Sequence, residues 1–139
     1  MELVVTAELP CPPERLFVEV DDLADYPRWM GLVHSAEPLE PDVWRGERRA
    51  RVGPFARSKR HRMRRTDLTS SSHARFERAE NDGRRHGEWV LDVVVESIGS
   101  GSRLVMTLTY SGRLWSSVVE RVLHEEIEAS KVRLRDLVA

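Results

Sequence analysis

The sequence predicts an α+β protein in which a seven-stranded antiparallel sheet wraps around a long C-terminal helix, with two short helices between the first and second strands. Three observations lead to this fold class. Short segments with apolar residues at every second position recur along the chain, and turn-forming residues separate them. A long segment with helical spacing of its apolar residues ends the chain. A shorter segment with the same spacing follows the first predicted strand.

The N-terminal elements are a strand and two short helices. Residues 2–9 alternate apolar and polar side chains, which predicts a strand, and the Cys-Pro-Pro sequence that follows ends it. A proline suits the first turn of a helix, and the apolar spacing then predicts a helix over 13–23. Because Pro27 cannot sit comfortably inside a helix, we expect a break near residues 24–26 and a second short helix after it. The apolar face of that second helix would be Trp29, Met30, Leu32 and Val33.

Six further strands are predicted between residues 34 and 111, and short turns join them. The clearest strand segments after the second one are 43–52, 55–66, 73–80, 86–97 and 103–111. Turn signals lie at Gly53-Pro54, Ser70 to Ser72, Asn81-Asp82-Gly83 and Gly99-Ser100-Gly101. The Asn-Asp-Gly sequence is a strong hairpin signal. Strands joined in this way form an antiparallel meander.

The long C-terminal helix is predicted over residues 113–138. At 100° per residue one arc collects Val119, Leu123, Ile127, Ser130, Leu134, Leu137 and Val138. Glu125, Glu128 and Arg135 fall largely elsewhere, so we expect the arc to pack on the concave side of the sheet. The small residues Gly112, Ser116 and Ser130 on that arc would either leave room for a ligand or permit close packing.

Composition limits the class of protein. A chain of 139 residues with net charge −1 and a hydrophobic fraction of 40% predicts one globular domain. No apolar run approaches the ~20 residues of a membrane span and no signal peptide is recognisable, so we expect a cytoplasmic protein. Cys11 is the single cysteine, which excludes an internal disulfide and a thiolate zinc cluster. The histidines other than His61 are scattered and no cofactor motif occurs, so we expect neither a metal nor a cofactor.

The charges are unevenly distributed along the chain. Residues 1–42 contain ten acidic and two basic side chains, whereas residues 45–65 contain ten basic and one acidic. This basic band could bind nucleic acid or an anionic membrane through arginines on the outer strand face. Those arginines are Arg45, Arg49, Arg51, Arg60, Arg62 and Arg64. The slightly acidic total and the lack of aromatic residues on that face argue against nucleic acid. The acidic third could neutralise the band within one chain or across a homodimer.

The order of elements, with CPPERLFVEVDDLADYPRWM at the front and GRLWSSVVERVLHEEIEASKVRLRDL at the back, resembles the START/Bet v 1-like (SRPBCC) superfamily, especially its polyketide cyclase/dehydrase and lipid-transport group. The resemblance covers essentially the whole chain. It implies a helix-grip fold with an apolar cavity between sheet and helix. Members bind lipids, sterols, polyketides or plant hormones, and some are cyclases, aromatases or hydrolases. This sequence departs from the pattern at Cys11, where alanine is common, and in its arginine-rich third and fourth strands.

Alternation along the strands assigns the inward faces and so predicts the site. Arg48, Lys59, His61 and Arg78 are polar residues on otherwise apolar faces, and each needs an acid such as Glu77, water or an anionic ligand as its partner. Trp29 is predicted as a core residue beneath the Tyr-Pro corner. The predicted ligand-binding residues are Trp44, Arg48, Lys59, His61, Met63, Phe76, Arg78, Trp89, Leu91, Met106, Tyr110, Trp115, Val119 and Leu123.

Three functions follow from these residues. The favoured one is the binding of a small hydrophobic, anionic ligand such as a fatty acid, a phospholipid or a polyketide acid. The first alternative is a cyclase, dehydratase or aromatase in the same cavity, with His61 as general base and Arg48 or Lys59 steadying an enolate. The second is nucleic-acid or anionic-membrane binding through the outer arginines.

Overall fold

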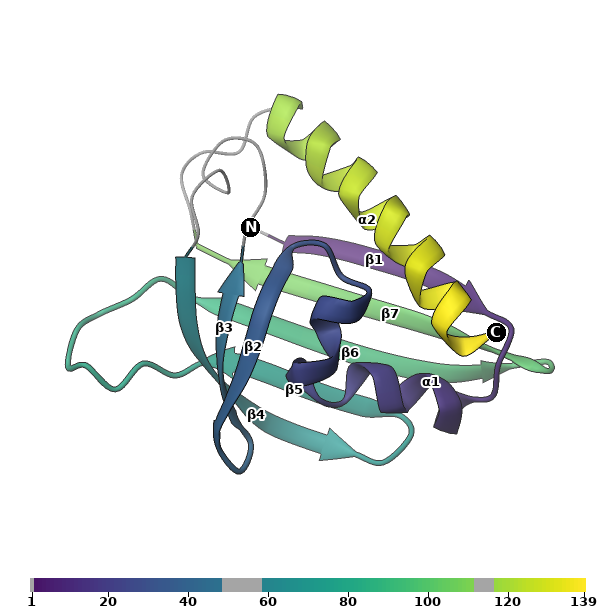
Figure 1. Ribbon diagram of the computed structural model, residues 1–139, viewed down its shortest axis with the longest axis horizontal. Coiled ribbons are helices and arrows are strands. Elements are labelled where there is room, and N and C mark those ends of the chain that lie inside the picture. The colour runs from purple at the N-terminus through teal and green to yellow at the C-terminus, as the bar shows by residue number, and fades with distance from the viewer. Residues whose placement is uncertain (1, 49–58, 112–116) are drawn as a thin grey trace.

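The fold is known from a computed structural model, which describes residues 2–48, 59–111 and 117–139. It confirms the predicted class, a seven-stranded antiparallel sheet with a long C-terminal helix and two short helices after the first strand (Figure 1). The elements are β1 (Glu2–Leu9), α1 (Pro13–Val20), the 3-10 helix η1 (Leu23–Arg28), β2 (Val33–Glu40), β3 (Val43–Arg48), β4 (Lys59–Thr69), β5 (His73–Arg78), β6 (Trp89–Ile98), β7 (Gly101–Tyr110) and α2 (Ser117–Val138).

The sheet has the strand order β1-β7-β6-β5-β4-β3-β2. Strands β2 to β7 form the predicted meander, and β1 pairs with β7, the last strand, so that β1 and β2 are the two edges. In Figure 1 α2 runs along β1, and its C-terminal end lies near α1. The sheet therefore presents one face to the helices and the other to solvent.

The register places the predicted inward residues on one face. Leu3 lies opposite Leu108, which lies opposite Leu91, which in turn lies opposite Phe76. Residues directly opposite each other in antiparallel strands point to the same side of the sheet. This row therefore confirms that the apolar sides of β6 and β7 belong to the helix-covered face.

Helix α2 buries the arc that its periodicity predicts. Leu123, Ile127, Ser130, Leu134 and Val138 are buried, while the predicted outward residues are exposed. The hydroxyl of Ser130 accepts a hydrogen bond from the Gly31 amide at 3.1 Å and donates one to the Glu126 carbonyl oxygen at 2.9 Å. Of the two roles open to this small residue, Ser130 thus has the packing role. The expected start of the helix, with Gly112 and Ser116, lies outside the described residues.

The break between the two short helices was predicted in the wrong place. Helix α1 ends at Val20, and the next helix spans Leu23–Arg28 with Pro27 inside it. The reason is the extended conformation of Asp22, whose side chain accepts a hydrogen bond from the Ala24 amide and caps η1. Proline is tolerated because the bonds from the Asp25 and Trp29 amides that close η1 do not need an amide at position 27.

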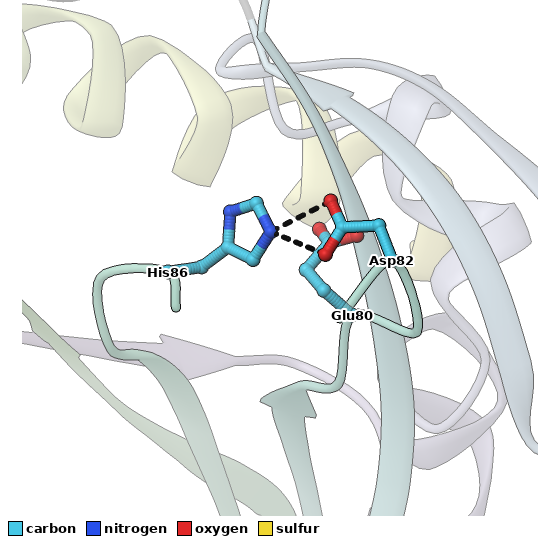
Figure 2. Close-up of side chains that lie close together, drawn as sticks. All are labelled: Glu80, Asp82 and His86. Atoms are coloured by element: carbon cyan, nitrogen blue, oxygen red, sulfur yellow. Dashed lines mark hydrogen bonds and ion pairs between the residues drawn. The ribbon is translucent and has the colours of Figure 1, made fainter. Parts of the chain in front are cut away.

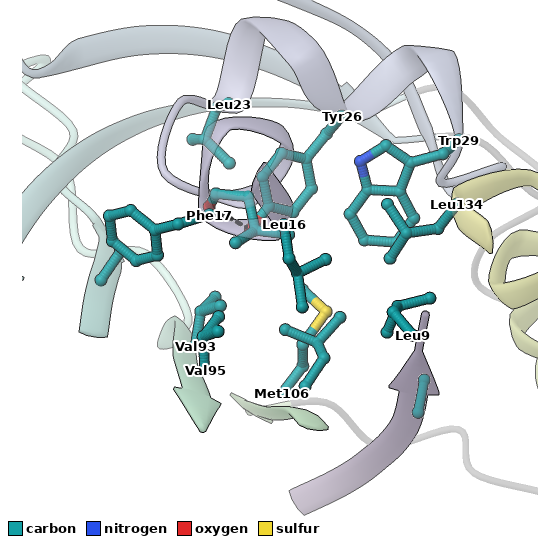
Figure 3. Close-up of a cluster of buried hydrophobic side chains, with 14 of the residues drawn as sticks. Leu9, Leu16, Phe17, Leu23, Tyr26, Trp29, Val93, Val95, Met106 and Leu134 are labelled. Atoms are coloured by element: carbon teal, nitrogen blue, oxygen red, sulfur yellow. Dashed lines mark hydrogen bonds between the residues drawn. The ribbon is translucent and has the colours of Figure 1, made fainter. Parts of the chain in front are cut away.

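The core lies where α1 and η1 pack on the sheet (Figure 3). Tyr26 is fully buried and donates its hydroxyl hydrogen to the Val20 carbonyl oxygen at 2.8 Å. Trp29 donates its indole hydrogen to the Glu19 carbonyl oxygen at 3.1 Å, and its ring lies 5.1 Å from that of Tyr26. The Tyr-Pro-Arg-Trp corner therefore fixes both short helices to the core, and Trp29 has the core role predicted for it.

The connection between β5 and β6 also differs from its prediction. The Asn-Asp-Gly sequence joins two paired strands, as predicted, but β5 ends at Arg78 and β6 begins only at Trp89, whereas strands ending at residue 80 and starting at residue 86 were expected. Gly83 adopts a left-handed conformation with φ 74°, and the Asp82 side chain accepts a hydrogen bond from the Arg84 amide. The turn signal thus marks the tip of a longer loop. The turn predicted at Gly53-Pro54 lies outside the described residues.

Asp25 provides a pH-dependent stability prediction. Burial raises the pKa of its carboxyl group, and the neighbouring Asp22 and Glu19 raise it further against the opposing effect of Arg28. The folded state therefore binds a proton more tightly than the unfolded state, and this stabilising contribution disappears as the pH rises through the folded pKa. We expect Asp25→Asn to raise the free energy of unfolding at pH 7 by up to ~0.5 kcal/mol.

The check is urea unfolding of wild type and Asp25→Asn at two pH values. The gain should vanish at roughly pH 3, below the ordinary aspartate pKa, where the Asp25 carboxyl group of the wild type is mostly protonated in both the folded and the unfolded state. An equal gain at both pH values would contradict the electrostatic explanation.

Candidate ligand-binding cavity

A cavity of about 120 Å³ lies between the helix-covered face of the sheet, η1 and α2. Its wall is predominantly apolar, and the polar side chains gather on β3, β4 and the end of β7. The lining residues are Leu3, Val5, Leu23, Tyr26, Met30, Leu32, Val33, Ala36, Gly46, Glu47, Arg48, His61, Met63, Trp89, Leu91, Met106, Leu108, Tyr110, Leu123 and Ile127. An apolar hollow with a few polar groups at one end is typical of a small-molecule site.

Arg48 and His61 form the polar end through adjacent strands. Arg48 lies on β3 and His61 on β4, and Arg48 Nε donates a hydrogen bond to His61 Nε2 at 2.9 Å. A nitrogen that accepts a hydrogen bond carries no proton, so the imidazole in this arrangement is neutral with its hydrogen on Nδ1. The pair therefore brings one positive charge to the cavity, and the guanidinium carries it.

An aromatic group completes this end of the cavity. Trp89 of β6 and Tyr110 of β7 are cross-strand partners, and their ring centroids are 5.2 Å apart. The His61 ring lies 5.1 Å from that of Trp89, and the Arg48 guanidinium carbon lies 4.9 Å from the Trp89 ring centroid. This distance is within the range of a cation–π interaction. We call Arg48, His61, Trp89 and Tyr110 the polar cluster.

Burial changes the proton affinities of two members of the polar cluster. It lowers the pKa of the Arg48 guanidinium, an effect that Tyr110 offsets and Arg78 reinforces. Burial also raises the pKa of the Tyr110 hydroxyl, with the Arg48 charge opposing it. Arginine and tyrosine both ordinarily titrate well above pH 7. Arg48 therefore stays charged at pH 7, and Tyr110 stays protonated. The cavity therefore combines the Arg48 cation with a neutral phenol group.

The sequence matches the family described as polyketide cyclase / dehydrase and lipid transport over residues 1–139. The chain belongs to this family. The match confirms the resemblance to the START/Bet v 1-like superfamily that its terminal segments suggest. No curated protein matches the chain. Within residues 2–48, 59–111 and 117–139, no helix is both long and apolar enough to cross a bilayer.

Solved structures of similar fold come from several bacteria. The START superfamily protein of Mycobacterium smegmatis has a TM-score of 0.74 and 15% identity, covering 99% of this chain and 96% of its own. DR_A0006 of Deinococcus radiodurans has a TM-score of 0.73 and 18% identity, covering 97% of both chains. TTHA0849 of Thermus thermophilus has a TM-score of 0.71 and 23% identity, covering 99% of this chain and 97% of its own. At these identities the likeness concerns the fold alone.

The predicted site residues divide into three groups in this family member. Those that line the cavity are Arg48, His61, Met63, Trp89, Leu91, Met106, Tyr110 and Leu123. Trp44 and Phe76 lie in the core cluster instead, and Arg78 bonds Glu80 rather than Glu77. The Lys59 and Val119 side chains and all of Trp115 lie outside what the structure describes.

Several lining residues were not predicted. Leu3 and Val5 follow the period-two pattern of β1, and Ile127 lies on the inward arc of α2. The direction of these side chains was therefore predictable, but their position in the wall of a cavity was not. Tyr26 and Met30 reach the cavity from η1 and the turn after it. No sequence signal shows how a 3-10 helix and its turn approach the sheet.

Glu80, Asp82 and His86 gather in the loop between β5 and β6 (Figure 2). Each offers one potential metal ligand atom, and these atoms lie within 4.8 Å of one another. His86 Nε2 is 2.9 Å from both Asp82 carboxylate oxygens, and Glu80 accepts a hydrogen bond from Arg78 Nε at 3.1 Å. Arg78 also lies 3.3 Å from His86 Nδ1. The arginine cation already compensates this group, so we interpret it as an anchor for the loop.

The pKa values of the two carboxyl groups agree with this role. Burial opposes ionisation of Glu80, but bonds from the Arg62 amide and the Arg78 side chain together hold its pKa below the ordinary value. The Arg84 amide and the His86 side chain lower the pKa of Asp82. Both carboxylates are therefore stabilised in their charged form by groups of the protein itself.

The arginines of the outer face are interleaved with acids. Arg45 lies opposite Glu37, Arg60 opposite Glu47, and Arg64 opposite Glu77 in the strand register. The fourth described arginine, Arg62, bonds the Glu40 carboxylate at 3.2 Å and the Ala79 carbonyl oxygen at 2.9 Å. Arg49 and Arg51 lie outside the described residues. The described part of this face offers phosphates far less net positive charge than residues 45–65 alone suggest.

Proposed function

We propose that this protein binds a small hydrophobic ligand carrying an anionic group in the cavity beneath α2. The observation that carries the proposal is the Arg48 guanidinium at one end of a predominantly apolar wall, where it contacts both the His61 imidazole and the Trp89 ring. An amphiphilic acid would place its carboxylate beside the guanidinium, which binds such groups through parallel hydrogen bonds. Its apolar part would lie among Met63, Leu91 and Met106.

The size of the cavity favours a compact ligand. A cavity of roughly 150 Å³ lined by apolar residues can hold a benzene ring. The volume of about 120 Å³ in this protein is therefore suited to one ring or a short branched chain. A longer fatty acid or phospholipid would need additional space. We accordingly expect a cyclic or short-chain acid to bind more tightly than a long-chain lipid.

Catalysis with His61 as general base is the alternative function, because the family description includes cyclases and dehydrases. A general base must offer a lone pair to the proton that it removes. In this arrangement Nε2 already accepts the hydrogen of Arg48, and Nδ1 carries a hydrogen of its own. His61 could act as a base only after Arg48 moved away. The geometry therefore supports binding better than proton abstraction.

Two probes of nearly identical shape, benzoate and benzamide, test the proposed function by calorimetric titration. Wild type should bind the charged acid at least tenfold more tightly than the neutral amide. We expect Arg48→Gln to weaken acid binding about 10- to 100-fold, since hydrogen bonds to charged groups contribute about 1.5–3 kcal/mol, and to change amide binding little.

Arg45→Gln is the matched control, because Arg45 lies on the same strand but on the exposed outer face. It should bind both probes like wild type. Equal affinity of wild type for acid and amide, or unchanged acid binding by Arg48→Gln, would refute an anion site at Arg48.

A further inference from the structure

We infer that Trp89 is a positioning residue, which orients the Arg48 guanidinium and thereby sets the preference of the cavity for anions. This inference rests on the proposed function and assigns one side chain a role in its selectivity. Trp89 begins β6 and lies directly opposite Tyr110. Its ring also contacts the His61 ring and the Arg48 guanidinium, so one indole meets the other three members of the polar cluster.

The contact with Arg48 is the important one. An aromatic ring carries negative charge on its face, and among side chains the indole attracts a cation most strongly. A guanidinium stacked on that face is held in one plane, whereas the bond from Nε to His61 fixes one edge of the same group. Both contacts restrict the direction of the terminal nitrogens, the fork through which arginine binds a carboxylate.

Arginine needs such support because its long side chain has many rotamers. The conformational entropy of a mobile arginine must be lost when a ligand binds, and this loss weakens binding. A guanidinium already held by an indole and an imidazole has lost much of that freedom beforehand. Removing the indole would leave the charge in the protein but would take away its fixed orientation.

This role differs measurably from that of a simple wall. If Trp89 only filled space, its loss would weaken binding of charged and neutral probes by the same factor. If it orients Arg48, its loss must weaken binding of the charged probe by a larger factor than binding of the neutral probe. The selectivity ratio, the affinity for benzoate divided by that for benzamide, therefore separates the two roles.

The experiment compares wild type with Trp89→Leu and Trp89→Phe by calorimetric titration of both probes. We expect Trp89→Leu to reduce the selectivity ratio about tenfold and Trp89→Phe, which keeps a weaker ring face, to reduce it by a smaller factor. Leu91→Ala is the control, since Leu91 lines the cavity two residues further along β6 without a described contact to Arg48. It should leave the ratio unchanged.

A spectroscopic measurement on the ligand-free protein accompanies the titrations. Ring currents of the indole should shift the Arg48 Nε–H resonance, which Arg48→Gln identifies by removing it, and Trp89→Phe should reduce that shift. The inference would be overturned if Trp89→Leu weakened the affinity for both probes by the same factor, or if Trp89→Phe left the Arg48 resonance unchanged. Either result would leave the proposed function standing. Wild type that binds neither probe would overturn both.

Discussion

Replacing Phe76 by alanine should lower the free energy of unfolding by about 3–5 kcal/mol, the range for truncating a large aromatic residue in a core. Phe76 is fully buried at the centre of β5. Its ring lies edge-on to those of Tyr26 and Trp44, with centroid distances of 6.1 and 5.7 Å. The substitution leaves a void among rigid aromatic groups, which cannot close without moving η1 or β3.

Urea denaturation followed by tryptophan fluorescence measures this effect. Leu39→Ala is the control, because Leu39 is an exposed apolar residue on β2 and should cost under ~0.5 kcal/mol. A loss below about 1 kcal/mol for Phe76→Ala would mean that Phe76 does not lie in a close-packed core.

Replacing Arg28 by alanine should lower the free energy of unfolding by about 2–4 kcal/mol, because it leaves a buried carboxylate with incomplete compensation. Only 4% of the Glu19 side chain is exposed, and Arg28 bonds its two oxygens at 2.7 and 2.6 Å. Arg15 bonds the same carboxylate at 3.0 Å and the Leu137 carbonyl oxygen at 2.7 Å. Glu19 thus links α1 to η1 directly, and to α2 through Arg15.

A double variant shows whether the buried charge is the cause. Arg28→Ala combined with Glu19→Gln removes the carboxylate charge as well, so it should be more stable than Arg28→Ala alone in thermal or urea unfolding. A double variant that is less stable than the single one would show that lost packing of the arginine, rather than the cost of an uncompensated buried charge, explains the effect.

The architecture was predictable because it depends on periodicity. Strand alternation fixed the inward sides of β6 and β7, and helical spacing fixed the buried arc of α2, since both patterns express one apolar core. The errors arose where a local interaction decided the structure. The cap at Asp22 moved the start of η1, and the loop that the bonds of Asp82 hold is longer than the connection expected between residues 80 and 86.

The cavity was predictable only in part. Alternation placed Arg48 and His61 on an inward face, but it could not show that their side chains bond each other or that both meet the Trp89 ring. The same alternation placed Arg78 inward, yet Arg78 bonds Glu80 and lies beside His86. The side of the sheet to which a residue points depends on its own strand. The residues that its side chain contacts depend on loops and on strand register, which the sequence does not reveal.

Whether the cavity binds an anion at Arg48 is tested most directly by native mass spectrometry of protein purified without detergent, followed by denaturation and analysis of any small molecule that is released. We expect a compact hydrophobic acid bound one to one, present on Arg45→Gln and lost from Arg48→Gln. A released molecule that is neutral, or that Arg48→Gln retains as fully as wild type, would contradict this expectation.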